Sequence, residues 1–300
     1  MINPKNKWRR YNTPLGICIN EKCETVISKY LIPNYQGQIQ LIFTSPPFPL
    51  NRAKKYGNLM GDEYKKWLCD VVKSMLPLLT EDGSIVIEIG NAWNYGEPTF
   101  STLPMETLLS IKNECGLSLC QEFIYYNPAR LPSPIQYVNI DRIRVKDSFT
   151  RVWWFSRSAN PKANNRNVLK QYSKQMKKLL ETGQYNAGER PSEHSISETA
   201  FSNDNGGAIP SNVIIASNTN SRDPYLLRCK ENGIKIHPAR MPFEVPRFFI
   251  NLLTDENDIV MDCFAGSNTT GYCAEEAKRR WISVEADKDY YMGSKYRFMR

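Results

Sequence analysis

The sequence contains no apolar run near the roughly 20 residues that a membrane-spanning helix needs, and no apolar stretch follows its polar, basic first ten residues. Without a span or an export signal, we expect a soluble protein that stays in the cytoplasm of a prokaryote. Low-complexity tracts and internal repeats are also missing, and 41% hydrophobic with 23% charged residues is ordinary for a globular chain. A membrane protein and a largely disordered protein are therefore both excluded.

Residues that bind zinc are few and badly spaced. The chain has two histidines, His194 and His237, and none of its eight cysteines belongs to a Cys-x-x-Cys pair. Structural zinc sites commonly use such pairs, so we expect no bound metal. The cysteines fit reduced, mostly buried thiols in a cytosol.

Acidic residues are missing from 148–180, where eight basic residues occur, and the whole chain carries a net charge of +8. For any single residue, a solvated surface explains the charge. For the cluster, the bias favours a polyanionic partner such as DNA. The predicted phosphate contacts are Arg52, Lys54, Arg130, Arg142, Arg144, Arg151, Arg157, Lys174, Lys177 and Lys178.

Short β-branched and aromatic runs alternate with segments long enough for helices, which predicts an α/β sheet. The expected strands are Ile17–Ile19, Gln40–Thr44, Ser84–Ile89, Leu119–Tyr126, Val152–Phe155, Ile259–Cys263 and Trp281–Glu285. The expected helices are Glu24–Tyr30, Asp62–Leu79, Leu103–Cys115, Val245–Leu253 and Asn268–Arg279. Residues 156–236 are rich in Asn, Ser, Lys and Gly, so we expect an inserted lobe there, between catalytic parts 1–155 and 237–300.

A ligand-binding turn is predicted after the strand that ends at Cys263. The residues 264–271, Phe-Ala-Gly-Ser-Asn-Thr-Thr-Gly, lead into a helix and then a strand that ends in Glu285. This arrangement lets backbone approach a nucleotide-like ligand while a carboxylate takes ribose hydroxyls. A phosphate-binding loop would need Lys-Ser or Lys-Thr where Tyr272-Cys273 stand, and Asn268 replaces the second Gly of the dinucleotide pattern. S-adenosyl-L-methionine has no phosphate and needs neither.

Only 15 residues follow Glu285, so the sheet cannot be completed on the C-terminal side. The last two strands in the chain then correspond to the first two strands of an ordinary cofactor-binding sheet. The five strands that precede them in the chain supply the other five strands of that sheet. The chain length therefore predicts a permuted, seven-stranded, Rossmann-like methyltransferase fold that depends on S-adenosylmethionine and carries an inserted lobe.

The strand Gln40–Thr44 runs into Ser45-Pro46-Pro47-Phe48. Prolines can simply end a strand, but these residues also suit methylation of an exocyclic amino group. That nitrogen is a poor nucleophile until two fixed acceptors, here the Ser45 hydroxyl and the Pro46 carbonyl, take its hydrogens. Pro47 stiffens the loop, and Phe48 can stack on a base flipped out of the duplex. Methylation at ring carbon five commonly uses a Pro-Cys pair, which is missing.

Together these motifs resemble the amino-methylating DNA methyltransferases of the β arrangement, especially the N4-cytosine enzymes of type II restriction-modification systems. The segments that carry the resemblance are 44–48, 82–84, 131–135, 152–155, 237–240 and 264–271. The resemblance implies that Ser45, Pro46 and Phe48 hold the target base and that the inserted lobe recognises DNA. The cofactor site is expected to include Asp262, Phe264, Gly266, Ser267, Asn268, Thr269 and Glu285, with His237 and Pro238 closing over it.

Two positions leave alternatives open. The family usually offers an aspartate after the strand at Ile17–Ile19, whereas this chain has Asn20-Glu21, so either residue is a candidate contact to the adenine. Glu88 is either the group that hydrogen-bonds Ser45 and draws off the released proton or a structural acid. The expected partners are double-stranded DNA with a flipped cytosine and a cognate restriction endonuclease that acts on the same sequence.

Three rival functions remain open. The same fold methylates N6 of adenine in some relatives, although Ser before Pro-Pro favours cytosine N4. A DNA-binding relative without catalysis is disfavoured because both the catalytic loop and the cofactor turn are intact. Methyl transfer to a protein amide or to RNA is disfavoured by the large basic insertion.

Overall fold

The computed structural model describes residues 8–48, 59–183, 188–189, 195–196 and 202–299. The chain divides into two compact units, one from Met1–Ala163 with Asn212–Arg300 and one from Asn164–Ser211. The smaller unit is narrower than the lobe expected at 156–236, because the flanking segments belong to the larger unit. The segment from Asn212 to Ile236 contributes both an edge strand of the main sheet and a helix.

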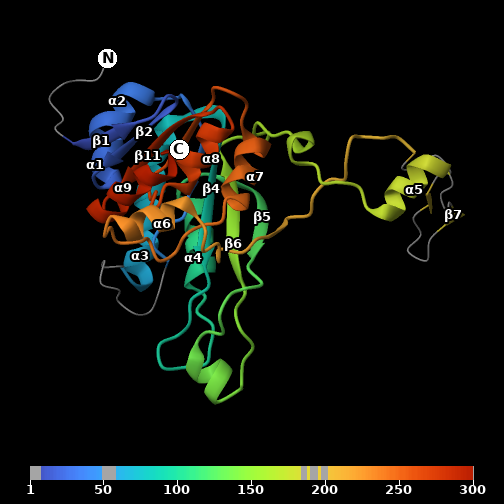
Figure 1. Ribbon diagram of the computed structural model, residues 1–300, viewed down its shortest axis with the longest axis horizontal. Coiled ribbons are helices and arrows are strands. Elements are labelled where there is room, and N and C mark those ends of the chain that lie inside the picture. Colours follow the sequence, from blue (N-terminus) through green and yellow to red (C-terminus); the bar gives the residue numbers. More distant parts are fainter. Residues whose placement is uncertain (1–7, 49–58, 184–187, 190–194, 197–201, 300) are drawn as a thin grey trace. The chain divides into compact units, whose positions relative to one another are not determined.

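In the described part of the larger unit, nine strands form one sheet in the order β1-β2-β11-β10-β3-β4-β6-β5-β9 (Figure 1). Their bounds in that order are Arg9–Asn12, Gly16–Asn20, Arg280–Glu285, Ile259–Asp262, Ile39–Thr44, Leu79–Gly90, Phe149–Ser156, Ser118–Tyr126 and Val213–Ile215. All seven predicted strands are confirmed and lie together in the middle. The two additional strands, β1 and β9, are short edge strands that bury few side chains, so no hydrophobic run marked them.

The helices that cover the sheet also follow the sequence pattern. Those predicted are α1 (Cys23–Val26) continuing through the π-helix η1 (Ile27–Leu31) into α2 (Ile32–Tyr35), then α3 (Gly61–Met75), α4 (Leu103–Glu114), α7 (Glu244–Leu253) and α8 (Thr269–Glu276). Helix α3 ends earlier than expected, because Pro77 lies in the short 3-10 helix η2 (Leu76–Leu78) and Leu79 already begins β4.

Several short elements were not predicted. They are α6 (Pro224–Glu231), α9 (Lys288–Ser294), the π-helix η3 (Gln136–Ile140) and the 3-10 helix η5 (Lys295–Arg297) in the larger unit. In the smaller unit they are α5 (Lys174–Thr182), the 3-10 helix η4 (Asn165–Val168) and the pair β7 (Gly188–Glu189) and β8 (Ser195–Ile196). Helix α5 has ordinary end signals: the Ser173 hydroxyl caps its start, and Gly183 ends it with a φ of +64°.

The core lies on both faces of the sheet because neighbouring residues of a strand point to opposite sides. Ile42 of β3 packs with Leu68 and Val72 of α3 in one hydrophobic cluster. The next residue, Phe43, meets Phe249 of α7 with ring centroids 5.7 Å apart. Seven of the eight cysteine side chains are buried, as expected. Among the described residues, no helix is both long and apolar enough to span a membrane.

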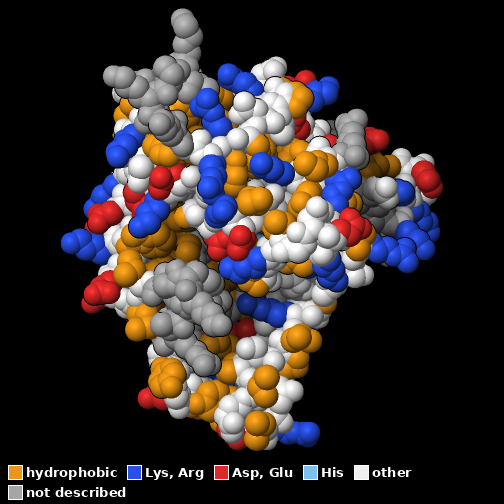
Figure 2. Space-filling view, turned by 60° about the vertical axis from the view of Figure 1, so that its left-hand side comes forward, with side chains coloured by type: hydrophobic (Ala, Val, Ile, Leu, Met, Phe, Trp, Pro, Cys, Tyr) orange, Lys and Arg blue, Asp and Glu red, His pale blue; other side chains and the backbone are white. Residues whose placement is uncertain are grey.

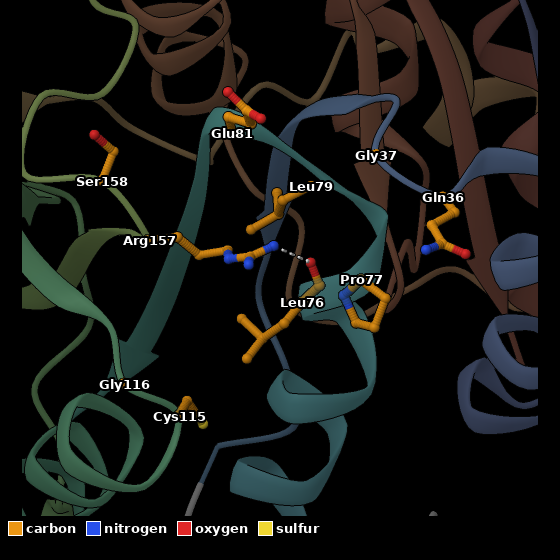
Figure 3. Close-up of a pocket in the computed structure, with 10 residues that line it drawn as sticks. All are labelled: Gln36, Gly37, Leu76, Pro77, Leu79, Glu81, Cys115, Gly116, Arg157 and Ser158. Carbon is orange, nitrogen blue, oxygen red and sulfur yellow. Dashed lines mark hydrogen bonds between the residues drawn. The ribbon is translucent and has the colours of Figure 1, made fainter.

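The parallel strands β11, β10, β3 and β4 all end at the same edge of the sheet. This edge, here called the reaction edge, carries Thr44, Gly90, Asp262 and Glu285. A cavity of about 1070 Å³ lies at the opposite edge, where Gly37 precedes β3 and Leu79 begins β4. Figure 3 shows Arg157 beside it, donating a hydrogen bond to the Leu76 carbonyl. That cavity is therefore separate from the predicted catalytic loop.

Candidate active site

A buried hydrogen bond joins the two predicted loops. The Thr44 hydroxyl at the end of β3 donates to Oδ1 of Asp262 at the end of β10, over 2.8 Å. Asp262 also accepts from the Thr270 hydroxyl at 2.7 Å and from the Phe264 N–H at 3.1 Å. Burial raises the pKa of Asp262, while these three donors lower it. The sequence predicted Asp262, but it did not mark Thr44 or Thr270 as its partners.

Ser45 contacts Glu88, the buried acid near the end of β4. The carboxyl group of Glu88 accepts a hydrogen bond from the Thr150 hydroxyl over 2.8 Å, and the Ser45 side chain lies near enough to influence the pKa of Glu88. Burial is the main influence on the pKa of Glu88 and raises it, whereas the two hydroxyls and the nearby Arg130 charge lower it. Glu88 is therefore an acceptor available to the Ser45 hydroxyl. The lone pairs of the Ser45 oxygen remain available to accept another hydrogen bond.

The remainder of the catalytic loop packs on the end of β4. Pro46 is buried, and Pro47 and Phe48 are half-buried. The Phe48 ring lies so close to Gly90 that a Cβ there would come within 2.4 Å of its Cδ2. Gly90 therefore permits the approach of Phe48, a requirement that no sequence motif indicated.

The turn after β10 is shaped around the carboxylate of Glu285. Gly266 has a φ of +53°, and its N–H donates to Oε2 of Glu285 over 2.6 Å. The other oxygen, Oε1, accepts the N–H of Asp287 over 2.7 Å. Burial is the main cause that raises the pKa of Glu285 to about 7, with the Asp287 and Asp262 charges adding to it and the two N–H donors opposing it.

The side chains of two predicted cofactor residues of this turn make hydrogen bonds within the protein. Asn268 is fully buried and caps α8 with a φ of 55°. Its Oδ1 accepts from Gly271 and Ser283, and its Nδ2 donates to the Tyr11 hydroxyl. Ser267 receives hydrogen bonds at its carbonyl and its hydroxyl from the buried Arg297. These residues shape the turn; Thr269, also buried, lies beside Ser267.

Arg297 was not found from the sequence, because a lone arginine near the end of the chain has no motif around it. It also pairs with Asp223 over 3.4 Å and lies over the ring of Tyr225 at 4.7 Å. Through these contacts it connects the turn to α6.

The segment that begins at His237 lies against the turn. A Cβ on Gly266 would be 3.0 Å from Nε2 of His237, whose ring makes an edge contact with Tyr290 at 4.5 Å. Burial lowers the pKa of His237 to about 4, so the imidazole is neutral at pH 7. Pro238 is exposed beside it. Within the described part of the chain, Nη1 of Arg240 is buried and has no hydrogen-bond partner.

The other two predicted cofactor residues lie at the same edge. Asn20 ends β2 and donates from Nδ2 to the carbonyls of Glu285 and Ala286, at 2.8 and 3.2 Å. It thereby fixes the chain just beyond Glu285. Phe264 is half-buried, with its ring centroid 5.5 Å from that of Trp67 on α3.

The residues present fit S-adenosylmethionine. The turn brings bare backbone at Gly266 beside a carboxylate suited to ribose hydroxyls, and it presents no lysine of the kind that neutralises a triphosphate. The buried, unpartnered Nη1 of Arg240 is a donor suited to a carboxylate such as that of the methionine part.

Comparison with known proteins agrees with this geometry. A family model described as DNA methylase matches residues 39–295. The chain belongs to this DNA methylase family. The methylase is 46% identical over 263 residues to the type II methyltransferase M.PvuII of Proteus hauseri, which is 87% of this chain and 78% of that protein. It is 22% identical to the type II methyltransferase M.BglII of Bacillus subtilis, over 85% of this chain and 62% of that one.

Solved structures confirm the predicted methyltransferase fold. The methylase matches the PvuII DNA methyltransferase (cytosine-N4-specific) with a TM-score of 0.78 and 36% identity, covering 97% of this chain and 88% of that one. It matches the M1.HpyAVI–SAM complex with a TM-score of 0.57 and 17% identity, covering 94% and 98%, which shows the fold alone. The resemblance to amino-methylating DNA methyltransferases is thus confirmed.

The predicted phosphate contacts of the methylase are distributed over several surfaces. Arg130, Arg144 and Arg151 lie near the reaction edge and also make contacts within the protein, such as that of Arg151 with Asn91. Arg142 is exposed, as are Lys174, Lys177 and Lys178 on α5 of the smaller unit. Arg157 lies at the opposite edge of the sheet, away from the predicted catalytic loop. Arg52 and Lys54 lie outside the described residues.

Proposed function

We propose that the protein transfers a methyl group from S-adenosylmethionine to N4 of a cytosine in a short duplex DNA sequence. It would act in the cytoplasm and protect that sequence from a partner restriction endonuclease. The observation that carries the proposal is the buried Thr44–Asp262 hydrogen bond, which holds Ser45 and the nearby Glu88 beside the cofactor turn at the reaction edge. The relative named cytosine-N4-specific, which is 36% identical in structure comparison, supports the choice of cytosine.

The chemistry assigned to Ser45 follows from its place beside Glu88. With its hydroxyl donating to Glu88, the Ser45 oxygen accepts one hydrogen of the target amino group, and the Pro46 carbonyl accepts the other. Two acceptors held in place favour a pyramidal nitrogen and stabilise the positive charge that develops on it. The bound cofactor supplies an electrophilic methyl group on a positively charged sulfur. The proton released from the nitrogen passes through the Ser45 oxygen to Glu88.

The cofactor is held by residues of the turn. Glu285 accepts the ribose hydroxyls, and Gly266 and Phe264 line the site, with His237 and Pro238 covering it. Asn268, Ser267 and Thr269 give the turn its shape. Asn20 acts by holding the chain after Glu285. The lobe around α5 contacts DNA phosphates through its lysines.

The test is to incubate the purified protein with DNA and S-adenosylmethionine, digest the DNA to nucleosides and identify the modified nucleoside by mass. N4-methylcytosine is expected, and it should disappear with Ser45→Ala. Detection of N6-methyladenine would instead identify adenine as the target base. Unmodified DNA would refute the proposed activity.

A further inference from the structure

The connection between β5 and β6 extends from the reaction edge and exposes large hydrophobic side chains. Residues 128–147, here called the β5–β6 projection, extend below these strands in Figure 1 and carry the π-helix η3. The exposed side chains there and on the adjacent 91–102 segment are Tyr95 (81%), Leu131 (79%), Ile135 (65%), Ile140 (64%), Ile143 (61%) and Val145 (85%). They include the three most exposed large hydrophobic side chains among the described residues.

The projection is braced, so it presents these side chains in a fixed arrangement. Asn127 N–H donates to the Ser148 carbonyl at its base over 2.7 Å, and Lys146 Nζ donates to the carbonyls of Pro128 and Arg130. These contacts hold the outgoing and returning chain segments of the projection together. Leu131 directly follows Arg130 and Val145 directly precedes Lys146, so both lie next to the braced base.

The adjacent segment supports the projection from one side. The guanidinium of Arg144 lies 4.0 Å from the centroid of the Trp93 ring and donates to the Pro98 carbonyl. Figure 2 shows hydrophobic side chains gathered on this lower end of the molecule. A contiguous patch of exposed apolar side chains often marks a binding surface.

The projection leaves the sheet next to the proposed catalytic residues. Its last residues lead into Phe149 and Thr150, and the Thr150 hydroxyl contacts Glu88 over 2.8 Å. Arg130 at its start donates to the Phe149 carbonyl, and its charge lowers the pKa of Glu88. The projection that carries the apolar side chains thus continues directly into β6, the strand whose Thr150 contacts Glu88.

The charge of the surface favours DNA over a second copy of this basic chain. The projection has four basic side chains, Arg130, Arg142, Arg144 and Lys146, and two acidic ones, Asp141 and Asp147. Proteins that unstack DNA commonly insert apolar side chains between bases, with basic residues on the phosphates around them. An enzyme that flips a base must also offset the stacking energy that the base gives up.

We propose that the β5–β6 projection enters the DNA beside the target base and that Leu131 and Val145 fill the space in the stack that the flipped base leaves. This inference rests on the proposed function, since it requires a base to be flipped. It assigns base extrusion to the projection, while the inserted lobe contacts the phosphates.

The test uses Leu131→Gln, Val145→Gln and the double variant, which change apolar area without changing charge. Leu109→Gln on α4 is the matched control, because Leu109 is also exposed (55%) but lies outside the projection. Single-turnover methylation is measured on the normal duplex and on one with an abasic site opposite the target base. Cofactor affinity, thermal stability and oligomeric mass are measured for each variant.

On the normal duplex, the double variant should lose at least about tenfold in rate, whereas the duplex with the abasic site, whose target base is already unpaired, should be methylated at close to the normal rate. The fluorescence of a 2-aminopurine placed beside the target base should be lower with the double variant than with the unsubstituted protein, because less of the target base is flipped out. Leu109→Gln should behave as the unsubstituted protein. Equal losses on both duplexes, or none, would overturn the proposal.

Two further outcomes can be told apart from a loss of base flipping. A change from dimer to monomer with unchanged methylation would assign the surface to a second copy and overturn the proposal. If the double variant unfolds, the single variants Leu131→Gln and Val145→Gln carry the same comparison. Failure of the unsubstituted protein to methylate any duplex would refute the proposed function instead.

Discussion

The Thr44 hydroxyl donates to the Asp262 carboxylate over 2.8 Å although 218 positions separate the two residues in the chain. Ser45 directly follows Thr44, and the turn to Gly266 directly follows Asp262. The bond therefore fixes the spacing between the loop proposed to hold the base and the turn proposed to hold the methyl donor. A small shift there would misalign nitrogen and methyl carbon, and reaction rates are sensitive to such misplacement.

Thr44→Val should lower the free energy of unfolding by about 1–3 kcal/mol, because it leaves a buried carboxylate with one donor fewer. It should also lower the methylation rate at saturating cofactor. Thr270→Val is the matched control, since it removes another Asp262 donor without touching the catalytic loop. Urea unfolding and single-turnover rates measure both effects. Equal rates for the two variants would contradict the coupling between the loops.

Ser45→Ala should reduce turnover by about a hundredfold or more, the range seen when one fixed hydrogen-bonding group at a developing charge is removed. Cofactor affinity should change little, because Ser45 acts at the base. Isothermal titration with the cofactor and single-turnover rates separate the two quantities. Equal losses in rate and affinity would remove Ser45 from the proposed role.

Because burial raises the pKa of Glu88, the methylation rate should rise with pH until that carboxyl is ionised and then level off. The ionised form is the one that accepts the Ser45 proton. Glu88→Gln should lower the rate and flatten this part of the pH profile. A profile unchanged by the substitution would make Glu88 a structural acid only.

Cofactor affinity should fall as pH drops below about 7, because the pKa of Glu285 is raised to about 7 and the protonated carboxyl is a poorer acceptor for ribose hydroxyls. Above that pH the affinity should be constant. Glu285→Ala should weaken the cofactor at every pH and abolish the dependence. An affinity of Glu285→Ala equal to that of the unsubstituted protein would remove Glu285 from the site.

Gly266→Ala should weaken the cofactor by about tenfold, because a left-handed backbone costs a non-glycine residue roughly 1 kcal/mol or more. Its Cβ would also lie 3.0 Å from Nε2 of His237. The same substitution should cost less in a His237→Ala background, where only the backbone strain remains. A double-mutant cycle measures the difference. An unchanged cost would show that His237 does not restrict the turn.

Replacement of Lys174, Lys177 and Lys178 by Gln should make DNA binding less dependent on salt. For each lysine that binds a phosphate, its replacement should reduce the slope of log affinity against log salt concentration by about 0.9. Arg157→Gln is the control, because Arg157 lies at the opposite edge of the sheet. A slope unchanged by the lysine substitutions would place the phosphate-binding residues elsewhere.

The hydrophobic pattern was sufficient for the strands of the central sheet. Buried parallel strands such as β3 and β10 must be nearly continuous apolar runs, so they are visible in a single sequence. The order of the two motifs, with the loop 45–48 before the turn 264–271, fits the permuted arrangement. The edge strands β1 and β9 were not predicted because they bury few side chains. The helices α6 and α9 were not predicted because they are too short to show a strong periodicity.

The sequence by itself determined the chemical groups of this protein: a serine before two prolines, a small-residue turn and a carboxylate one strand later. Only the tertiary structure decided how they are connected. It showed that Thr44 bonds to Asp262, that Glu88 lies near Ser45, that Gly90 makes room for Phe48 and that Arg297 holds Ser267. These contacts join residues far apart in the chain, and a local pattern carries no information about which distant side chain will share a buried site.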